Sequence, residues 1–200
     1  MRAPPQAAPA PAGAARIVRW AQAQPSRWRN GRGTTRTLLD TRLDGERGWR
    51  VSVADITADA PFSAYPGVQR WFAVLDGDGV RLRLGDDWRT LRRGDAALHF
   101  DGAAAPECTL LGGATRDLNL MLQGCAGRMQ RFDDTLWEPG ECAACGAFTV
   151  QAAEVVCDAH TALTLPAMSL LWFDAPPRRV RWQRPADAVI YTLRIEVASP

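Results

Sequence analysis

The chain has 200 residues, which is enough for one ordinary domain or for two small β-domains fused together. Its 24 basic and 22 acidic residues give a net charge of +2, so the sequence offers no strong field for a nucleic acid or an anionic membrane. It lacks the run of about 18 apolar residues that a transmembrane helix needs, and its five scattered cysteines argue against a disulfide framework. We therefore expect a cytoplasmic protein with no nucleic-acid and no membrane partner.

Residues 1–15 are rich in proline and alanine, and we expect a disordered tail there. The glycine-containing segment 28–35, WRNGRGTT, follows. A phosphate-binding loop would need a Lys-Ser/Thr pair and a helix-forming segment behind it, and neither is present. We interpret the segment as a turn that lets the chain pass close to a pocket.

The rest of the chain reads as short strands. Residues 49–57 alternate, with Val51 and Val53 on one face and Arg50 and Ser52 on the other. Asp76-Gly-Asp-Gly79 is a strong hairpin signal, and similar turns recur along the chain. No segment after residue 17 keeps a helical period for long, so the pattern predicts an all-β sandwich or barrel.

The strand 116–122 divides most clearly into two faces. Its leucines, at 118, 120 and 122, form an ordinary core face, whereas Asp117, Asn119 and Met121 share the other face. Inside a barrel, bare polar groups there would cost a few kcal/mol each and would need partners or a ligand. The alternative is that this face meets solvent, and the sequence leaves both open.

Four segments in order resemble the HutD/Ves family: Trp28-Arg-Asn30-Gly-x-Gly-x-Thr35, Trp49-Arg50-x-Ser52-x-Ala-x-Ile56, Pro61-Phe62-Ser-x-Tyr65-Pro-Gly-x-x-Arg70, and Leu111-Gly-Gly-x-x-x-Asp117-x-Asn119-x-Met121. The resemblance covers about residues 16–200. Three positions depart from the family pattern: Arg32 and Ala60 stand where the family has glycine, and Tyr65 stands where it has phenylalanine.

The resemblance implies a bicupin, in which two cupin-like β-barrels (double-stranded β-helices) pack as one compact unit. We place the first barrel at 16–110 and the second at 111–200, with strands shared between them. Members are linked to the regulation of histidine utilisation, with formylglutamate or urocanate as candidate ligands, and Ves-type members to cold or stress response. No catalytic activity is firmly established for the family, so we lean against an enzyme.

The family segments and the strand pattern together predict a site for a small-molecule carboxylate ligand. Arginine can hold a carboxylate through two hydrogen bonds, short polar side chains can orient a neighbouring group, and aromatic or methionine side chains can form apolar walls. The residues predicted to bind the ligand are Trp28, Asn30, Arg50, Ser52, Phe62, Arg70, Asp117, Asn119 and Met121. The alternative is that Arg50 and Asp117 pair with each other to brace the barrel, since a buried arginine needs a partner.

The chain has two histidines, His99 and His160, too far apart for the usual cupin metal site, so we expect no metal and no cofactor. One alternative is a zinc site made by Cys142, Cys145, Cys157 and His160, because the spacing forms two pairs of ligands. Ser52 and Ser63 have no histidine nearby in sequence, which gives a hydrolase triad little support.

Our leading hypothesis is a metal-independent protein that senses or regulates histidine or amino-acid catabolism by binding a formylglutamate- or urocanate-like carboxylate. One alternative is a metal-independent cupin enzyme that acts on such a metabolite in the same pocket. Another is a bicupin that serves protein interaction through its outer sheet. A homodimer is open in each case.

Overall fold

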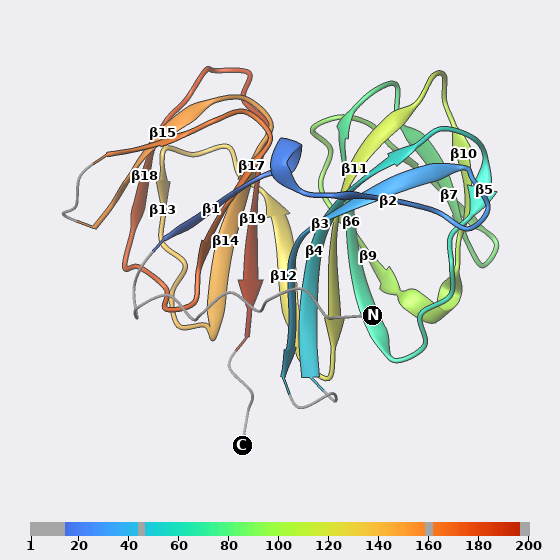
Figure 1. The fold of residues 1–200 in the computed structure, drawn as a ribbon, viewed down its shortest axis with the longest axis horizontal. Coiled ribbons are helices and arrows are strands. Elements are labelled where there is room, and N and C mark those ends of the chain that lie inside the picture. The colour runs from blue at the N-terminus through green and yellow to red at the C-terminus, as the bar shows by residue number, and fades with distance from the viewer. Residues whose placement is uncertain (1–14, 44–46, 159–161, 197–200) are drawn as a thin grey trace.

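The computed structural model describes residues 15–43, 47–158 and 162–196 (Figure 1). The predicted tail at 1–15 lies outside these residues, apart from Ala15. The described chain consists of β-strands and two short 3-10 helices, η1 (Trp20–Gln22) and η2 (Gly102–Ala104). The all-β prediction is therefore confirmed. None of the helices in the described residues is long and apolar enough to cross a membrane.

The N-terminal half forms a large sheet and a small one, which we call the first pair. The large sheet has six strands in the order β2 (Pro25–Arg27), β3 (Gly33–Leu43), β4 (Arg47–Ile56), β11 (Thr115–Gln123), β6 (Val68–Asp76) and β9 (Leu98–Asp101). The small sheet has four strands in the order β5 (Ala60–Pro61), β10 (Glu107–Leu110), β7 (Val80–Leu84) and β8 (Asp87–Leu91).

The C-terminal half forms the second pair on the same plan. Its large sheet has five strands in the order β1 (Arg16–Arg19), β17 (Ser169–Phe173), β14 (Ala144–Thr149), β19 (Ile190–Ile195) and β12 (Gly127–Arg131). Its small sheet has four strands in the order β13 (Leu136–Trp137), β18 (Val180–Gln183), β15 (Ala153–Cys157) and β16 (Leu163–Leu165).

The two pairs do not divide at residue 110. Strand β11 begins at Thr115 yet runs between β4 and β6 in the first large sheet. Strand β1 comes first in the chain, but it pairs with β17 in the second large sheet. Figure 1 shows β1, in blue, among the orange and red strands of the C-terminal half. Both ends of the described chain therefore belong to the second pair.

Three hydrophobic clusters hold the sheets together. One face of each large sheet contributes to a shared core, in which Leu118 and Leu120 of β11 join Phe148 of β14 and Trp172 of β17. A second cluster fills the interior of the second pair, and a third lies inside the first pair. The other face of β11, which carries Asp117, therefore points into the first pair, as strand alternation requires.

Candidate functional site

A cavity of about 590 Å³ lies within the first pair, over the inner face of the large sheet. Segment 61–65 and residues 26–30 complete its wall. Every residue predicted to bind the ligand lines it: Trp28, Asn30, Arg50, Ser52, Phe62, Arg70, Asp117, Asn119 and Met121. The structure thus brings residues from five separate segments together around one space.

The lining also includes residues that were not predicted to bind the ligand: Ser26, Arg27, Arg29, Thr35, Thr37, Ala54, Pro61, Ser63, Ala64 and Tyr65. Thr35 and Thr37 lie opposite Ala54 and Ser52 of β4, so strand register places them on the cavity face. Thr35, Ser63 and Tyr65 stand within the family-like segments, and that position could have identified them. Ser26 and Arg27 lie on the short edge strand β2 and carry no comparable signal.

A chain of hydrogen bonds joins Arg70, Asn119 and Asp117 at the buried end of the cavity. Arg70 comes from β6, next to β11 in the sheet. Its Nη2 donates to Asn119 Oδ1 at 2.7 Å, and Asn119 Nδ2 donates to Asp117 Oδ1. The relative exposures are 6% for Arg70, 6% for Asn119 and 1% for Asp117. The alternative that Asp117 and Asn119 meet solvent is therefore wrong.

The two titratable residues of this hydrogen-bonded group, Arg70 and Asp117, lack some of the partners that a buried charge needs. Arg70 takes part in none of the ion pairs that the described residues form, and its Nε has no hydrogen-bond partner among them. Burial lowers the pKa of Arg70, and the charge of Asp117 partly offsets this shift. Burial also raises the pKa of Asp117 well above its ordinary value, with Arg70 acting in the opposite direction.

Aromatic rings surround the Arg70 guanidinium. Its central carbon lies 5.0 Å from the Phe62 ring centroid, 5.2 Å from that of Phe100 and 5.8 Å from that of Tyr65. A cation above an aromatic face is attracted by the ring quadrupole, more strongly where water is excluded. These rings hold the cation in place without neutralising it, so its charge stays available to an anion.

Arg50 lies at the rim of the cavity and has its own partner. Its Nη2 lies 2.9 Å from Asp40 Oδ2, and its Nε donates to the same oxygen at 3.2 Å. The alternative that Arg50 pairs with Asp117 is therefore wrong. The two strands β3 and β4 form a hairpin that places Asp40 directly opposite Arg50.

The segment 28–35 forms part of the cavity wall. Trp28 Nε1 donates to Thr35 Oγ1 at 2.8 Å, and Asn30 Oδ1 accepts from the backbone N–H of Arg32 at 3.0 Å. The Arg32 guanidinium donates to the backbone carbonyl of Asp59. This hydrogen bond connects the turn to the next loop. Arg32 is exposed and is not among the residues that line the cavity.

Gly33 in this segment leaves no room for a side chain. A Cβ atom there would lie 2.6 Å from the Asp55 carbonyl oxygen and 3.0 Å from the Trp28 ring. The second glycine of the motif is therefore required by the close packing of the turn against β4, and it fixes where Trp28 stands.

The cysteines of the zinc alternative lie inside the second pair. Cys142, Cys145 and Cys157 are free thiols in its apolar cluster, and His160 lies outside the described residues. Burial raises the pKa of Cys157 to about 11 and that of Cys145 further still. No group of three or more potential ligands in the described residues is arranged to hold a metal ion.

Asp55, Glu107 and His99 do not line the cavity. Asp55 forms an ion pair with Arg116 at 2.7 Å on the far side of the sheet from the cavity, and Glu107 is exposed on β10. His99 is also exposed, and its ring stacks on Trp71 with centroids 4.7 Å apart. Asp117 is the one acidic residue among those that line the cavity.

Comparison with known proteins identifies the family. The HutD family profile matches residues 21–190. The chain belongs to the HutD family. A relative of this HutD chain, described as an uncharacterized 21.2 kDa protein in the hutC 3′ region of Pseudomonas putida, is 44% identical over 115 residues, or 54% of this chain and 59% of that protein. The protein Ves of Citrobacter koseri is 34% identical over 116 residues, with the same coverage. The chain therefore spans about three fifths of the length of these relatives.

Solved structures agree in fold over more of the chain. A conserved protein of unknown function from Pseudomonas aeruginosa has a TM-score of 0.78 at 27% identity, covering 92% of this HutD chain and 100% of its own. HutD from Pseudomonas fluorescens, solved in a formate condition, has a TM-score of 0.78 at 22% identity, covering 93% and 100%. Bacillus subtilis oxalate decarboxylase has a TM-score of 0.63 at 8% identity, covering 92% and 78%, which shows a cupin-type fold alone.

Proposed function

We propose that the protein binds a small carboxylate metabolite in the cavity of the first pair, with Arg70 as the group that pairs with the carboxylate. One observation supports this most: Arg70 is a buried cation with no carboxylate partner among the described residues, at the closed end of a cavity. A buried charge without a counterion is costly, and an entering anion removes that cost. The guanidinium also matches the planar geometry of a carboxylate.

The ligands to try first are formylglutamate and urocanate, in line with a role in sensing or regulating histidine or amino-acid catabolism. The hutC-region relative supports this choice of pathway. Ser52 and Asn119 supply hydrogen-bonding groups beside Arg70, and Trp28, Phe62 and Met121 supply apolar walls. In this proposal each pair of sheets is one cupin-like barrel, the protein is a cytoplasmic bicupin, and two copies form a homodimer.

Calorimetric titration with formylglutamate, urocanate and histidine tests the ligand. We expect formylglutamate or urocanate to bind and its carboxamide analogue to bind more weakly, because the carboxamide has no charge for Arg70. Arg70→Met should strongly weaken binding, whereas Arg50→Met, a matched change at the rim, should leave most of it, since Arg50 is already paired with Asp40. No heat from any of the three compounds at millimolar concentration would contradict the ligand assignment.

The regulatory part needs a separate experiment. Deletion of the gene should change transcription of the histidine-degradation genes during growth on histidine, and Arg70→Met should behave like the deletion. Unchanged transcript levels in the deletion strain would contradict this part and leave the binding site in place.

A second candidate is an isomerase or hydrolase in the same cavity. Asp117 favours it, because a buried carboxyl group with a raised pKa next to a bound anion is suited to general acid–base chemistry. This candidate predicts a product mass on incubation with formylglutamate or urocanate, lost in Asp117→Asn. Binding without any new mass would contradict it.

A further inference from the structure

Asp117 has more hydrogen-bonding capacity than its surroundings use. An ionised carboxylate offers about four acceptor sites on its two oxygens. Asp117 Oδ1 accepts from Asn119 Nδ2, whereas the buried Oδ2 has no partner among the described residues. The side chain lines the cavity and its residue is 1% exposed. An ionised Asp117 is therefore poorly satisfied, because one of its oxygens has no hydrogen-bond donor among the described residues of this cavity-lining site.

The charged and titratable groups around Asp117 come from three neighbouring strands. Arg70 on β6 attracts the ionised form through space, but Asn119 stands between the two in the hydrogen-bond chain. Asp55 on β4 repels the ionised form of Asp117. The charge of Asp117 in turn contributes to the raised pKa of the buried Cys108 thiol on β10. Arg70 is thus the one cation in this set.

An anion that enters this site would share that cation with Asp117. If Asp117 were ionised, two negative charges would face one guanidinium in a place from which water is largely excluded, which is the arrangement that raises carboxyl pKa values most strongly. If Asp117 is neutral, Arg70 pairs with the ligand alone, and the carboxyl O–H can donate to the second ligand oxygen. Such O–H···O⁻ hydrogen bonds are short and strong.

We propose that Asp117 is a specificity-determining residue that carries a proton when the cavity holds an anion, so that the bound carboxylate takes one hydrogen bond from the Asp117 hydroxyl and its ion pair from Arg70. This inference rests on the proposed function, and it adds the protonation state that the ligand requires. A carboxamide presents an N–H₂ group where the carboxylate presents its second oxygen. That donor meets the Asp117 donor, and an unpaired buried polar group discriminates strongly between ligands.

The dependence on pH follows from the same arrangement. In the free protein Asp117 has a pKa above its ordinary value, so it keeps its proton at low pH and loses it as the pH rises through that raised value. Because the anion needs the protonated form, its affinity should fall by about tenfold for each pH unit above that value. Asp117→Asn cannot ionise, and its affinity should not show this fall.

Infrared difference spectroscopy with formate as the probe tests the proposal directly. Formate is the smallest carboxylate and is fully ionised at neutral pH, so it adds no carbonyl band of a protonated acid. With formate bound at neutral pH, the wild-type protein should show the carbonyl stretch of a buried protonated carboxyl group, and the band should be missing from Asp117→Asn. If that variant does not fold, the wild-type protein labelled with [¹³C]aspartate carries the same test, because the band must shift with the label.

The possible outcomes separate the two proposals. Bound formate with the aspartate-specific band present supports both. Bound formate with the band absent contradicts the protonated Asp117 and leaves carboxylate binding intact. If neither formate nor the larger carboxylates give heat in the titration, the proposed function fails and this inference fails with it. The carboxylate-to-carboxamide preference of urocanate should also fall by about tenfold or more in Asp117→Asn, since an amide side chain can accept as well as donate.

Discussion

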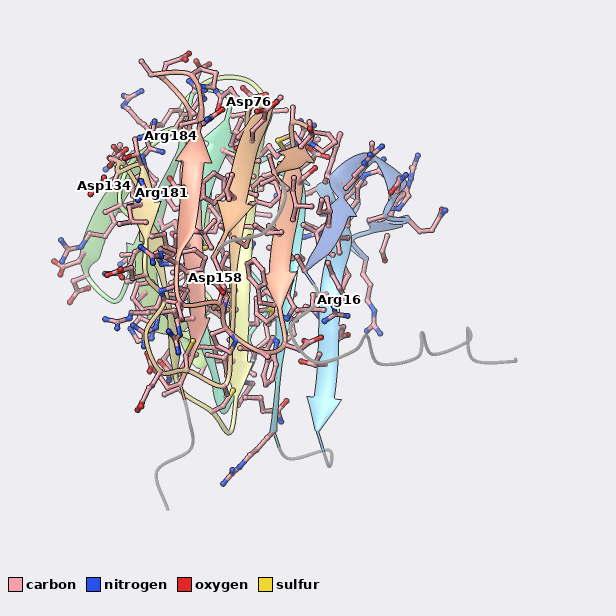
Figure 2. All side chains as sticks on the ribbon, turned by 90° about the vertical axis from the view of Figure 1, so that its left-hand side faces the viewer. Arg16, Asp76, Asp134, Asp158, Arg181 and Arg184 are labelled. Carbon is pink, nitrogen blue, oxygen red and sulfur yellow. The ribbon has the colours of Figure 1, made fainter. Side chains whose placement is uncertain are left out.

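The two pairs of sheets share a layout and differ in what they place inside. The interior of the first pair carries Arg70, Asp117 and Asn119 at the end of a cavity. The interior of the second pair carries Leu171, Phe173 and other apolar side chains, packed as one cluster. Arg181 and Arg184, which are labelled in Figure 2 on this side of the molecule, lie outside that cluster.

The difference shows which interior holds charged groups beside its apolar cluster. Apolar side chains at native density stabilise a sheet pair, whereas unpartnered buried polar groups cost free energy. Residues that break the local rule for an interior are expected at functional sites. The first pair breaks that rule with two charged residues, Arg70 and Asp117, whereas the apolar cluster of the second pair contains no charged residue among the described residues.

The largest expected effect is on the packed interior. Leu171→Ala removes a fully buried side chain from the second cluster, and we expect it to lower the free energy of unfolding by about 3 kcal/mol. The matched change in the first pair, Met121→Ala, removes a half-buried side chain from the cavity wall and should cost less than about 1 kcal/mol. Urea denaturation measures both. Equal losses would show that the first interior is packed like the second.

The next effect is on binding. Arg70→Met should weaken the binding of formylglutamate or urocanate by about a hundredfold, or about 2.7 kcal/mol, because no other cation lies at the buried end of the cavity among its lining residues. Arg50→Met should weaken it by less than about threefold, since a half-exposed ion pair contributes little. Titration of both variants, with circular dichroism to confirm folding, gives the comparison. A larger loss in Arg50→Met would move the anion site to the rim.

The turn at 28–33 gives a smaller effect. Gly33→Ala forces a Cβ atom against the Asp55 carbonyl and the Trp28 ring, and we expect a loss of about 2 kcal/mol in stability together with weaker binding. Gly113→Ala is the control, because no atom lies within 4 Å of the added Cβ. Thermal denaturation compares the two. A Gly33→Ala protein as stable as the control would show that the turn can move away from β4.

The smallest effect is a change in how the free energy of unfolding depends on pH. Asp117 keeps its proton to a higher pH in the native state than in the unfolded state, because its native pKa is raised. The contribution of Asp117 to the free energy of unfolding is therefore greatest below the ordinary aspartate pKa, and it falls as pH rises towards the raised native pKa. Asp117→Asn removes this term, so its stability relative to the wild type should rise by up to about 1.4 kcal/mol per pH unit in that window. Parallel stability curves for the two proteins would contradict a protonated native Asp117.

The alternation of side chains along single strands predicted much of the candidate site. Leu118, Leu120 and Leu122 lie in the shared core, and Asp117, Asn119 and Met121 face the cavity, as a period of two requires. The family-like segments supplied the residues on the other strands and loops. Together they predicted the all-β class and a set of residues that line one space.

The partners of these residues could not be predicted, because they depend on register. A β-bulge between Thr37 and Leu39 shifts β3 by one residue against β4. Without the extra residue, Leu39 would lie opposite Arg50, and Asp40 would point to the other face. Nothing in the sequence marks that bulge, so the pairing of Arg50 with Asp40 could not be predicted. The pairing of β1 with β17 could not be predicted either, because the four residues of β1 do not indicate which distant strand they pair with.

A crystal structure of the protein with formylglutamate, and a second with urocanate, tests the central claim most directly. We expect density for the ligand in the cavity of the first pair, with its carboxylate in contact with the Arg70 guanidinium and one carboxylate oxygen within hydrogen-bonding distance of Asp117 Oδ2. An empty cavity at saturating ligand concentration, or a ligand bound with its carboxylate away from Arg70, would contradict it.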